Sequence, residues 1–384
     1  MSNYDVMIIG AGLAGLSTAA HLIEQKKGIQ VLIYEARKIS SGASGVPGGM
    51  VNPVTGQKAN IVWNAEKGMS LLEKRLKTLE AHSSKNLFKE TGIIRPAVDD
   101  QLAERLSYLF KKRNLPKEWM EWLNEINLAE KVPGLKHSAG GLFIYKGKVV
   151  QTPEYLKAYA EYLESNGVTF QFGGPSRLKY HDAQWSLQCG RKVIKANQIV
   201  VAAGSKSREN RFWIDLPIRS VKGQLALYES DTPLDNLPAV SAYGYIAPLG
   251  KHTLAVGSTY ESIFDDENPD EHASKQLDDR LKDLLPSIYP SCRKVGLWSG
   301  IRATTPDRLP IAGKHPEYDT MYIYTGLGSK GLLLSEVVAE QLVQYLLYNE
   351  RLPNEISLYR FAKYRRLRQI ALEDMNNKSS SYRS

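Results

Sequence analysis

Apolar strand-like runs and one helical stretch alternate at the beginning of the chain. Residues 4–9 and 29–35 are short, β-rich apolar runs, and residues 13–26 between them repeat apolar side chains at helical spacing. Two strands joined by a helix form a βαβ unit, and the helical crossover makes the strands parallel. We therefore predict that the chain opens with a parallel sheet.

The middle of the chain shows a different pattern. Residues 60–130 contain long polar helical stretches, which are typical of an inserted cap, and a helix over 153–166 and a strand over 198–204 follow them. Residues 219–301 consist mostly of short strands, with one helix near 270–285. Such a succession of short strands indicates a second, mostly antiparallel sheet.

The last third returns to the first pattern. A strand over 321–326 is followed by a helix from about 331 to 349 and by a basic helix from about 355 onward. The predicted fold class is therefore α/β, with a Rossmann-like parallel-sheet domain and an inserted, mostly antiparallel substrate domain. The first domain is discontinuous and takes residues 1–55, 150–215 and 300–384, and the substrate or cap domain takes 56–149 and 216–299.

A glycine-rich turn joins the first strand to the first helix. Glycine lets the backbone approach a pyrophosphate closely, and the N-terminus of the helix stabilises its negative charge. An acid at the end of the second strand, Glu35, is placed to accept hydrogen bonds from a ribose hydroxyl. The turn and the acid predict a dinucleotide site. Its predicted contacts are Gly10, Gly12, Leu13, Ala14, Gly15 and Glu35.

A second loop of small residues, 40–53, follows soon after Glu35. Its backbone amides could reach a pyrophosphate or a ring system, and a nicotinamide dehydrogenase has no obvious need for such a loop. The loop therefore favours FAD over NAD, although a flexible surface loop has a similar composition. The predicted cofactor contacts in it are Ala43, Ser44, Gly48, Gly49 and Met50.

These motifs together resemble the D-amino-acid oxidase and glycine oxidase family of FAD enzymes. The resemblance extends over nearly the whole chain and includes residues 40–53, 198–207, 221–224, 299–313 and 324–340. It implies oxidation of a carbon–nitrogen bond next to a carboxylate, by transfer of a hydride to the flavin. It also implies non-covalent FAD, because the segment 299–313, where some relatives attach their flavin, contains no cysteine.

Within this family the motifs are most similar to the oxidoreductase half of a bifunctional tRNA-modifying enzyme, which removes the carboxymethyl group from a carboxymethylaminomethyl-uridine. The dinucleotide fold begins at residue 4, so we expect no methyltransferase half. A modified tRNA is thus one candidate substrate. A free small amino acid (glycine, sarcosine, proline or a D-amino acid) is the second hypothesis, and a non-catalytic flavoprotein or nucleic-acid-binding module is the third.

The resemblance also assigns residues to the substrate and the flavin. Arg302 matches the family arginine that clamps the substrate carboxylate, a role that suits the paired donors of a guanidinium. Tyr245 matches a tyrosine that shares the carboxylate, and Gln224 and Asp307 are weaker candidates. The N-terminus of the helix that begins near residue 331, together with Lys330, would stabilise negative charge on the reduced flavin. The remaining predicted flavin contacts are Ala203, Gly204, Gly328, Ser329, Lys330 and Gly331.

Composition adds expectations about partners and location. The formal net charge of +9 favours acidic partners such as nucleic acid, and the stretch Arg360–Arg368 could present Lys363, Arg365 and Arg366 to phosphates from one side of a helix. A solvated helical face is the alternative. The two cysteines and seven histidines show no metal-ligand spacing, so no metal is predicted. Without a signal peptide or an apolar run of roughly 18 residues, we expect a cytoplasmic protein with no membrane span.

Overall fold

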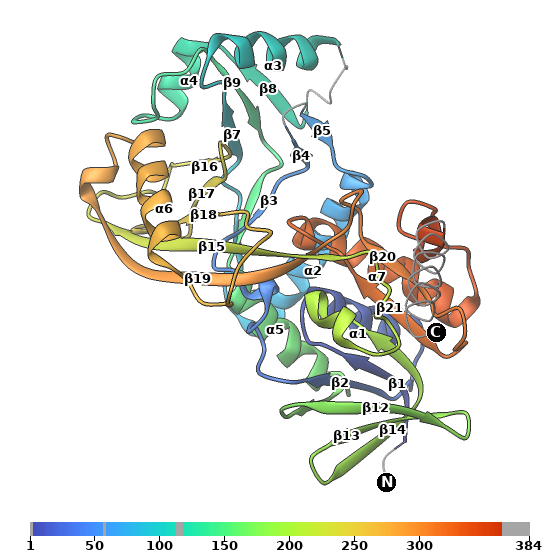
Figure 1. Cartoon of the computed structure of the whole chain (residues 1–384). Helices are drawn as coiled ribbons and strands as arrows, with labels where there is room; N and C mark the ends of the chain where they lie inside the picture. The colour runs from blue at the N-terminus through green and yellow to red at the C-terminus, as the bar shows by residue number, and fades with distance from the viewer. Residues whose placement is uncertain (1–2, 57–58, 113–117, 363–384) are drawn as a thin grey trace, which may run out of the picture.

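Two eight-stranded sheets organise the computed structural model, which describes residues 3–56, 59–112 and 118–362 (Figure 1). The first sheet has parallel strands at its centre, where β1 pairs with β2 and β14, and β14 also pairs with β21. On one side β2 continues to β11, and on the other β14 continues to the antiparallel pair β13 and β12. The strands are β1 (Asn3–Ile9), β2 (Val31–Glu35), β11 (Thr169–Phe172), β12 (Ser176–His181), β13 (Gln184–Cys189), β14 (Lys192–Val201), β20 (Ile311–Lys314) and β21 (Met321–Thr325).

Helices cover this parallel sheet. Residues 13–22 of helix α1 are all buried, and α1 packs against α7 and α5, as α2 also does (Figure 1). Because α1 and α7 come from opposite ends of the sequence, this layer joins the first and last parts of the described chain. The four helices are α1 (Leu13–Gln25), α2 (Ala65–Ser83), α5 (Thr152–Ser165) and α7 (Gly331–Tyr348).

The second sheet has the strand order β19-β15-β18-β17-β16-β7-β9-β8 and is antiparallel except where β16 meets β7. Helix α6 (Glu271–Leu284) packs against this sheet through Ala273, Leu277, Leu281 and Leu284, and α3 (Asp100–Lys112) and α4 (Glu125–Lys131) lie near its far end (Figure 1). The strands are β19 (Cys292–Thr304), β15 (Arg219–Ser230), β18 (Thr253–Gly257), β17 (Tyr245–Pro248), β16 (Ala239–Val240), β7 (Ile93–Pro96), β9 (Gly141–Ile144) and β8 (Met120–Leu123).

Small elements connect the two sheets. Strands β3, β10 and β6 form a three-stranded sheet, and β4 and β5 form a hairpin. Their bounds are β3 (Gly49–Val51), β4 (Val54–Thr55), β5 (Asn60–Ile61), β6 (Phe88–Lys89) and β10 (Lys148–Val150), and the 3₁₀ helices are η1 (Ala43–Gly45), η2 (Gly204–Glu209), η3 (Tyr289–Ser291) and η4 (Leu358–Phe361).

The predicted α/β fold, with one parallel and one antiparallel sheet, is confirmed, and three details differ. Strand β14 ends at Val201 rather than at residue 204, because the 3₁₀ helix η2 begins at Gly204. Helix α2 falls in the range assigned to the cap but packs against α5 and α7, so we propose the predicted domain division with α2 moved to the parallel-sheet side. The basic helix expected from about 355 is a short 3₁₀ helix, η4, as far as residue 361. Residues 363–368 of that prediction lie outside the described ranges.

Candidate active site

A cavity of about 1420 Å³ extends from the β1–α1 turn to the inner face of the antiparallel sheet. Sites for a single small ligand usually measure roughly 300–1,000 Å³, so this one has room for a large cofactor and a substrate together. Its lining includes Arg302, Tyr245 and all but two of the residues predicted to contact the cofactor. The sequence-based site residues, spread from position 10 to 331, are thus gathered around one space.

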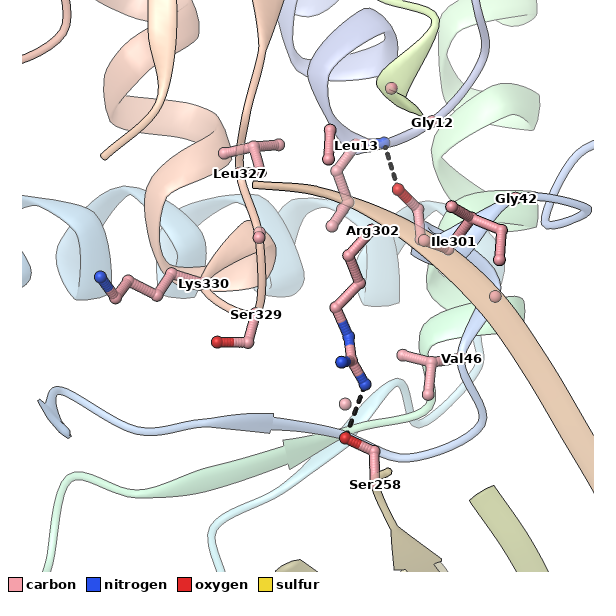
Figure 2. Close-up of a pocket in the computed structure, with 18 of the residues that line it drawn as sticks. Gly12, Leu13, Gly42, Val46, Ser258, Ile301, Arg302, Leu327, Ser329 and Lys330 are labelled. Atoms are coloured by element: carbon pink, nitrogen blue, oxygen red, sulfur yellow. Dashed lines mark hydrogen bonds between the residues drawn. The ribbon is translucent and has the colours of Figure 1, made fainter. Parts of the chain in front are cut away.

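The N-terminus of α1 forms one end of this cavity. Gly12 is the N-cap and has no side chain to cap the helix, so the amides of the first turn are free for a ligand, except that Leu13 donates to Ser44 Oγ at 3.2 Å (Figure 2). The Glu35 carboxylate accepts from the backbone amides of Ala11 and Arg37, both at 3.0 Å. These bonds hold the carboxylate at the edge of the cavity, where the predicted ribose contact requires it.

Two glycines predicted to contact the cofactor do not line the cavity. A Cβ on Gly15 would lie 1.9 Å from the carbonyl oxygen of Gly10, so this glycine allows α1 to pack directly on the preceding turn. Gly48 has φ +73°, and a Cβ there would lie 2.3 Å from Cδ2 of Leu249. Glycine is therefore needed at position 15 for close packing, and at position 48 for both close packing and the backbone conformation.

The N-terminus of α7 meets the same cavity from the other end of the sequence. Gly328, Ser329, Lys330 and Gly331 line it, and no side chain caps the helix, so its first amides present partial positive charge to the space. The Lys330 ammonium donates to the carbonyl of Arg308 at 2.9 Å, and burial lowers the pKa of Lys330. In Figure 2 the Lys330 side chain extends away from Arg302. The helix terminus is therefore better placed than the Lys330 ammonium to stabilise an anion.

Arg302 comes from β19 and extends toward Ser258, in the loop after β18 (Figure 2). Its Nη2 donates to Ser258 Oγ at 2.6 Å, and its Nη1 donates to the carbonyl of Thr259 at 3.4 Å. Within the described ranges no carboxylate lies within 4.0 Å of the Arg302 guanidinium. Burial lowers its pKa, but an arginine stays charged in proteins. The site therefore contains a partly buried cation that has no acid in contact in the described part of the chain, and Glu261 acts on it only from a longer distance.

Tyr245 lies on β17 and lines the cavity with Arg302. Burial raises the pKa of Tyr245 to about 12, so its hydroxyl remains a neutral hydrogen-bond donor at neutral pH. Glycines leave space for both side chains. A Cβ on Gly257 would lie 2.9 Å from the Tyr245 ring, and a Cβ on Gly223 would lie 2.0 Å from Nη2 of Arg302. Substrate-sized space beside these two groups thus depends on glycine in the neighbouring strands.

The two weaker candidates lie outside the cavity. Gln224 is buried behind Arg302, where its amide group donates to Glu261 at 3.1 Å and also to Asp270, while its backbone amide donates to Thr259 Oγ1. Gln224 thus holds the loop whose Ser258 and Thr259 contact Arg302. Asp307 instead pairs with Arg360, with 2.7 Å between Oδ2 and Nε. That ion pair engages Arg360, a member of the basic stretch predicted to meet phosphates.

Sequence reasoning missed several cavity residues. Arg95, Tyr243, Trp298 and Glu267 line the space, and none had been singled out. Arg95 carried a detectable signal, because a lone arginine stands in the apolar strand Ile93–Pro96. The other three lie in segments whose fold alone brings them to the site.

A Rossmann-type βαβ unit that opens onto a cavity, closed on its far side by an antiparallel sheet, is the architecture of a dinucleotide-binding protein. The family of FAD dependent oxidoreductases abbreviated DAO matches residues 5–345, and the chain belongs to this family. The cofactor is therefore FAD. Neither cysteine lines the cavity, so we expect FAD to be held without a covalent bond to sulfur.

Individual relatives fall into two groups. The tRNA 5-methylaminomethyl-2-thiouridine biosynthesis bifunctional protein MnmC of Leptospira interrogans is 28% identical over 93% of this chain, which spans only 59% of that protein. Glycine oxidase of Geobacillus kaustophilus is 25% identical over 96% of this chain and 99% of its own length. The crystal structure of that glycine oxidase superposes with a TM-score of 0.81 at 24% identity, covering 92% of this chain and 96% of the other. It therefore shares the fold.

Two further findings concern the described ranges alone. Their helices are too short or too polar to span a lipid bilayer. In the same ranges, no three His, Cys, Asp or Glu side chains come together in a group able to bind a metal.

Proposed function

We propose that this protein oxidises the carbon–nitrogen bond of an amine whose carbon carries a carboxylate. The observation that supports the proposal is the partly buried Arg302, which has hydrogen bonds to Ser258 and Thr259 but no acid in contact among the described residues. A cation that is largely withdrawn from water is unfavourable unless a ligand supplies a counter-charge. A substrate carboxylate fits the paired donors of the guanidinium, and the Tyr245 hydroxyl can donate a further hydrogen bond.

The residues of the site act by binding and orientation. FAD, when bound, accepts the hydride that leaves the substrate carbon. Arg302 and Tyr245 fix the carboxylate, which sets the direction of the neighbouring carbon–hydrogen bond and lowers the entropic cost of the reaction. Loss of the hydride with its electron pair leaves a protonated imine, and water then splits it into a protonated amine and an oxo acid. No general base is required if the amine enters unprotonated.

We propose a carboxymethylaminomethyl-uridine of tRNA as the substrate, with glyoxylate as the second product. Support comes from the similarity to the tRNA-modifying relatives over 93% of this chain and from the net charge of +9. A free small amino acid is the second candidate, and the match to glycine oxidase over nearly the full length of both chains favours it. Membership in an oxidoreductase family favours either candidate over a non-catalytic role.

Single-turnover bleaching of the flavin tests the function and separates the substrates. The holoprotein is mixed anaerobically with tRNA bearing the modified uridine, or with glycine, sarcosine, proline or D-amino acids, each at low and high salt. For tRNA the logarithm of the affinity should fall with log salt by roughly 0.7–0.9 per phosphate neutralised. A free amino acid bound at Arg302 should show a shallow dependence. Rapid bleaching by an amino acid at both salts, with none by tRNA, would show that the tRNA assignment is wrong.

A further inference from the structure

Arg95 is a second arginine that faces the cavity without a partner. It lies on β7, in the antiparallel sheet, and lines the same space as Arg302. Within the described ranges its guanidinium has neither a hydrogen bond nor an acid within 4.0 Å, and burial lowers its pKa. A half-buried arginine that has no partner favours the binding of an anion, as the partly buried Arg302 does.

Strand register places Arg95 in line with Tyr245. Val240 on β16 is opposite Ile94 on β7 and Ile246 on β17, so one residue further along, Ser241 lies between Arg95 and Tyr245. The hydrogen bond from the Ser241 amide to the carbonyl of Ile94 supports this alignment, and Figure 1 shows the three strands side by side. Opposite residues in a sheet share a face. Arg95 and Tyr245 are therefore about 10 Å apart at their Cα atoms, which is two strand spacings.

The charges around Arg95 are mostly positive. Arg105, on α3, also lines this end of the cavity and is exposed. The nearby acid Asp99 uses its Oδ1 to accept from the Leu102 amide at 2.7 Å, at the start of the same helix, and it is not paired with Arg95. Two guanidinium groups thus face one carboxylate that is already engaged, which leaves this end of the cavity attractive to an anion.

We propose that this end of the cavity is a second anion subsite, in which Arg95 binds an anionic oxygen group of the same substrate whose carboxylate Arg302 holds. The inference rests on the proposed function, because it needs the carboxylate at Arg302. The two strand spacings separate the Cα atoms of Arg95 and Tyr245, and the side chains extend from them into the cavity. This arrangement has room for a phosphodiester that a nucleoside separates from the carboxylate. An iminodiacid, whose carboxylates are joined through a CH2–NH–CH2 link, is the competing small ligand.

The part of the cavity wall next to Tyr245 has an aromatic ring on which a nucleoside base can stack. Tyr243 lies in the turn between β16 and β17, lines the cavity and is 70% exposed. An exposed aromatic ring beside a cationic group is the common arrangement for an unstacked RNA base, which stacks on the ring while its phosphate meets the arginine. We therefore assign the phosphodiester next to the modified uridine to Arg95.

The test compares Arg95→Gln with a matched control, Arg293→Gln. Arg293 lies in the same sheet but is exposed and paired with Glu229, away from the cavity. Flavin bleaching is followed with an anticodon stem-loop that bears carboxymethylaminomethyl-uridine, and with sarcosine, which has no second anion. Arg95→Gln should raise the half-saturating concentration of the RNA about tenfold or more, since a charged hydrogen bond is lost. Sarcosine should be unaffected, and Arg293→Gln should change neither.

A third substrate, N-carboxymethyl-glutamate, shows whether the anion at Arg95 comes from RNA or from a small carboxylated amine. If Arg95→Gln weakens N-carboxymethyl-glutamate, which has three carboxylates, but not the RNA, the subsite binds a small polycarboxylated amine and the assignment to a phosphodiester is overturned. If it weakens neither, the proposal is overturned. If no amine bleaches the unsubstituted protein, the proposed function fails, and the subsite is then tested by titrating the holoprotein with uridine monophosphate while recording the flavin absorbance. A weaker response in Arg95→Gln supports the subsite, and an equal response overturns it.

Discussion

Arg75 is a buried arginine and Arg302 is a partly buried one, and the charges around them differ. Arg75, on α2, donates to Glu24 on α1 through Nη1 at 2.5 Å and Nη2 at 3.2 Å, and to Glu336 on α7 through Nε at 3.3 Å. Burial alone would lower the pKa of Arg75, but Tyr159 and the two carboxylates raise it. At Arg302 burial prevails and the pKa is lowered. One arginine has its counter-charges built into the fold, and the other lacks them.

The Glu336 carboxylate, at the centre of the region around Arg75, is also engaged by several donors. Glu336 accepts from Tyr159 at 2.7 Å and lies 3.1 Å from His21 Nε2 and 3.3 Å from Arg75 Nε. It therefore joins α1, α2, α5 and α7 into one layer. A region that satisfies every charge internally contributes to stability, whereas a region that leaves a cation unsatisfied is prepared to bind an anion. Variants in the two regions should accordingly affect different measurements.

The largest effect is expected for Glu336→Leu, which leaves Arg75 and His21 without their central acceptor. Removing one partner from a buried ion pair typically costs about 3–5 kcal/mol of the free energy of unfolding. Urea unfolding of the holoprotein, followed by circular dichroism, measures the loss. The double variant Arg75→Leu with Glu336→Leu should recover part of it, because the buried Arg75 Nε that lost its acceptor is then absent and Glu24, which loses its partner, is partly exposed to water. An unchanged urea midpoint in Glu336→Leu would contradict the comparison.

Arg302→Lys should have the complementary effect. It keeps the charge and loses the paired donors, so kcat/KM should fall roughly tenfold to a hundredfold, corresponding to about 1.5–3 kcal/mol. Steady-state kinetics with the best substrate measures this change. FAD content and the urea midpoint should stay as they are, because nothing in the described fold depends on an ion pair of Arg302. Full activity in Arg302→Ala would place the carboxylate clamp elsewhere.

Acid should destabilise the region around Arg75 and Glu336. Burial by itself would raise the pKa of Glu336, but Arg75 and His21 hold it below the ordinary value of 4.5. The stabilisation is therefore complete above that value and is lost as the pH falls through the lowered pKa. Each unit by which the pKa is lowered corresponds to about 1.4 kcal/mol. Urea midpoints between neutral and acidic pH should fall more steeply in the unsubstituted protein than in Glu336→Gln, and parallel curves would argue against the assignment.

Gln224→Leu should show the smallest effect, because Gln224 acts on the substrate only through other residues. The side-chain amide of Gln224 forms hydrogen bonds with Glu261 and Asp270. These bonds fix the segment that follows β18, and Ser258 in this segment contacts Arg302. Loss of a hydrogen bond worth about 0.5–1.5 kcal/mol should raise KM by a few-fold while kcat is retained. The ratio of the two constants is the deciding measurement. A fall in kcat with constant KM would indicate a direct role in the reaction.

Local sequence patterns were sufficient for the dinucleotide end of the site. The turn Gly10–Gly15 and the acid Glu35 belong to one βαβ unit, so their spacing along the chain determines their arrangement in space. Arg302 and Tyr245 needed more than local pattern, and only the resemblance of their motifs to a family pointed to them. Their roles stay predictions, and the geometry is compatible with them.

The parts that could not be predicted depend on contacts between distant segments. Arg95 meets the site because β7 pairs with β16, almost 150 residues later, and no local pattern encodes that pairing. Helix α2 has an amphipathic pattern that suits either sheet, and the ion pairs of Arg75 with Glu24 and Glu336 show which layer it covers. Gly15 was expected to contact the cofactor because it belongs to the glycine motif. A glycine in such a motif can also serve close packing, and the local pattern does not distinguish the two roles.

The two helix N-termini that face the cavity are far apart in the sequence, so they are synthesised at different times. Helix α1 starts at Leu13 and α7 starts at Gly331, so the ribosome makes more than 300 residues between them. At about 5–20 residues per second, these two sides of the cavity are separated by tens of seconds of synthesis. During that interval a nascent chain offers only one side of the cavity. Stable loading of FAD must therefore wait until α7 has been translated.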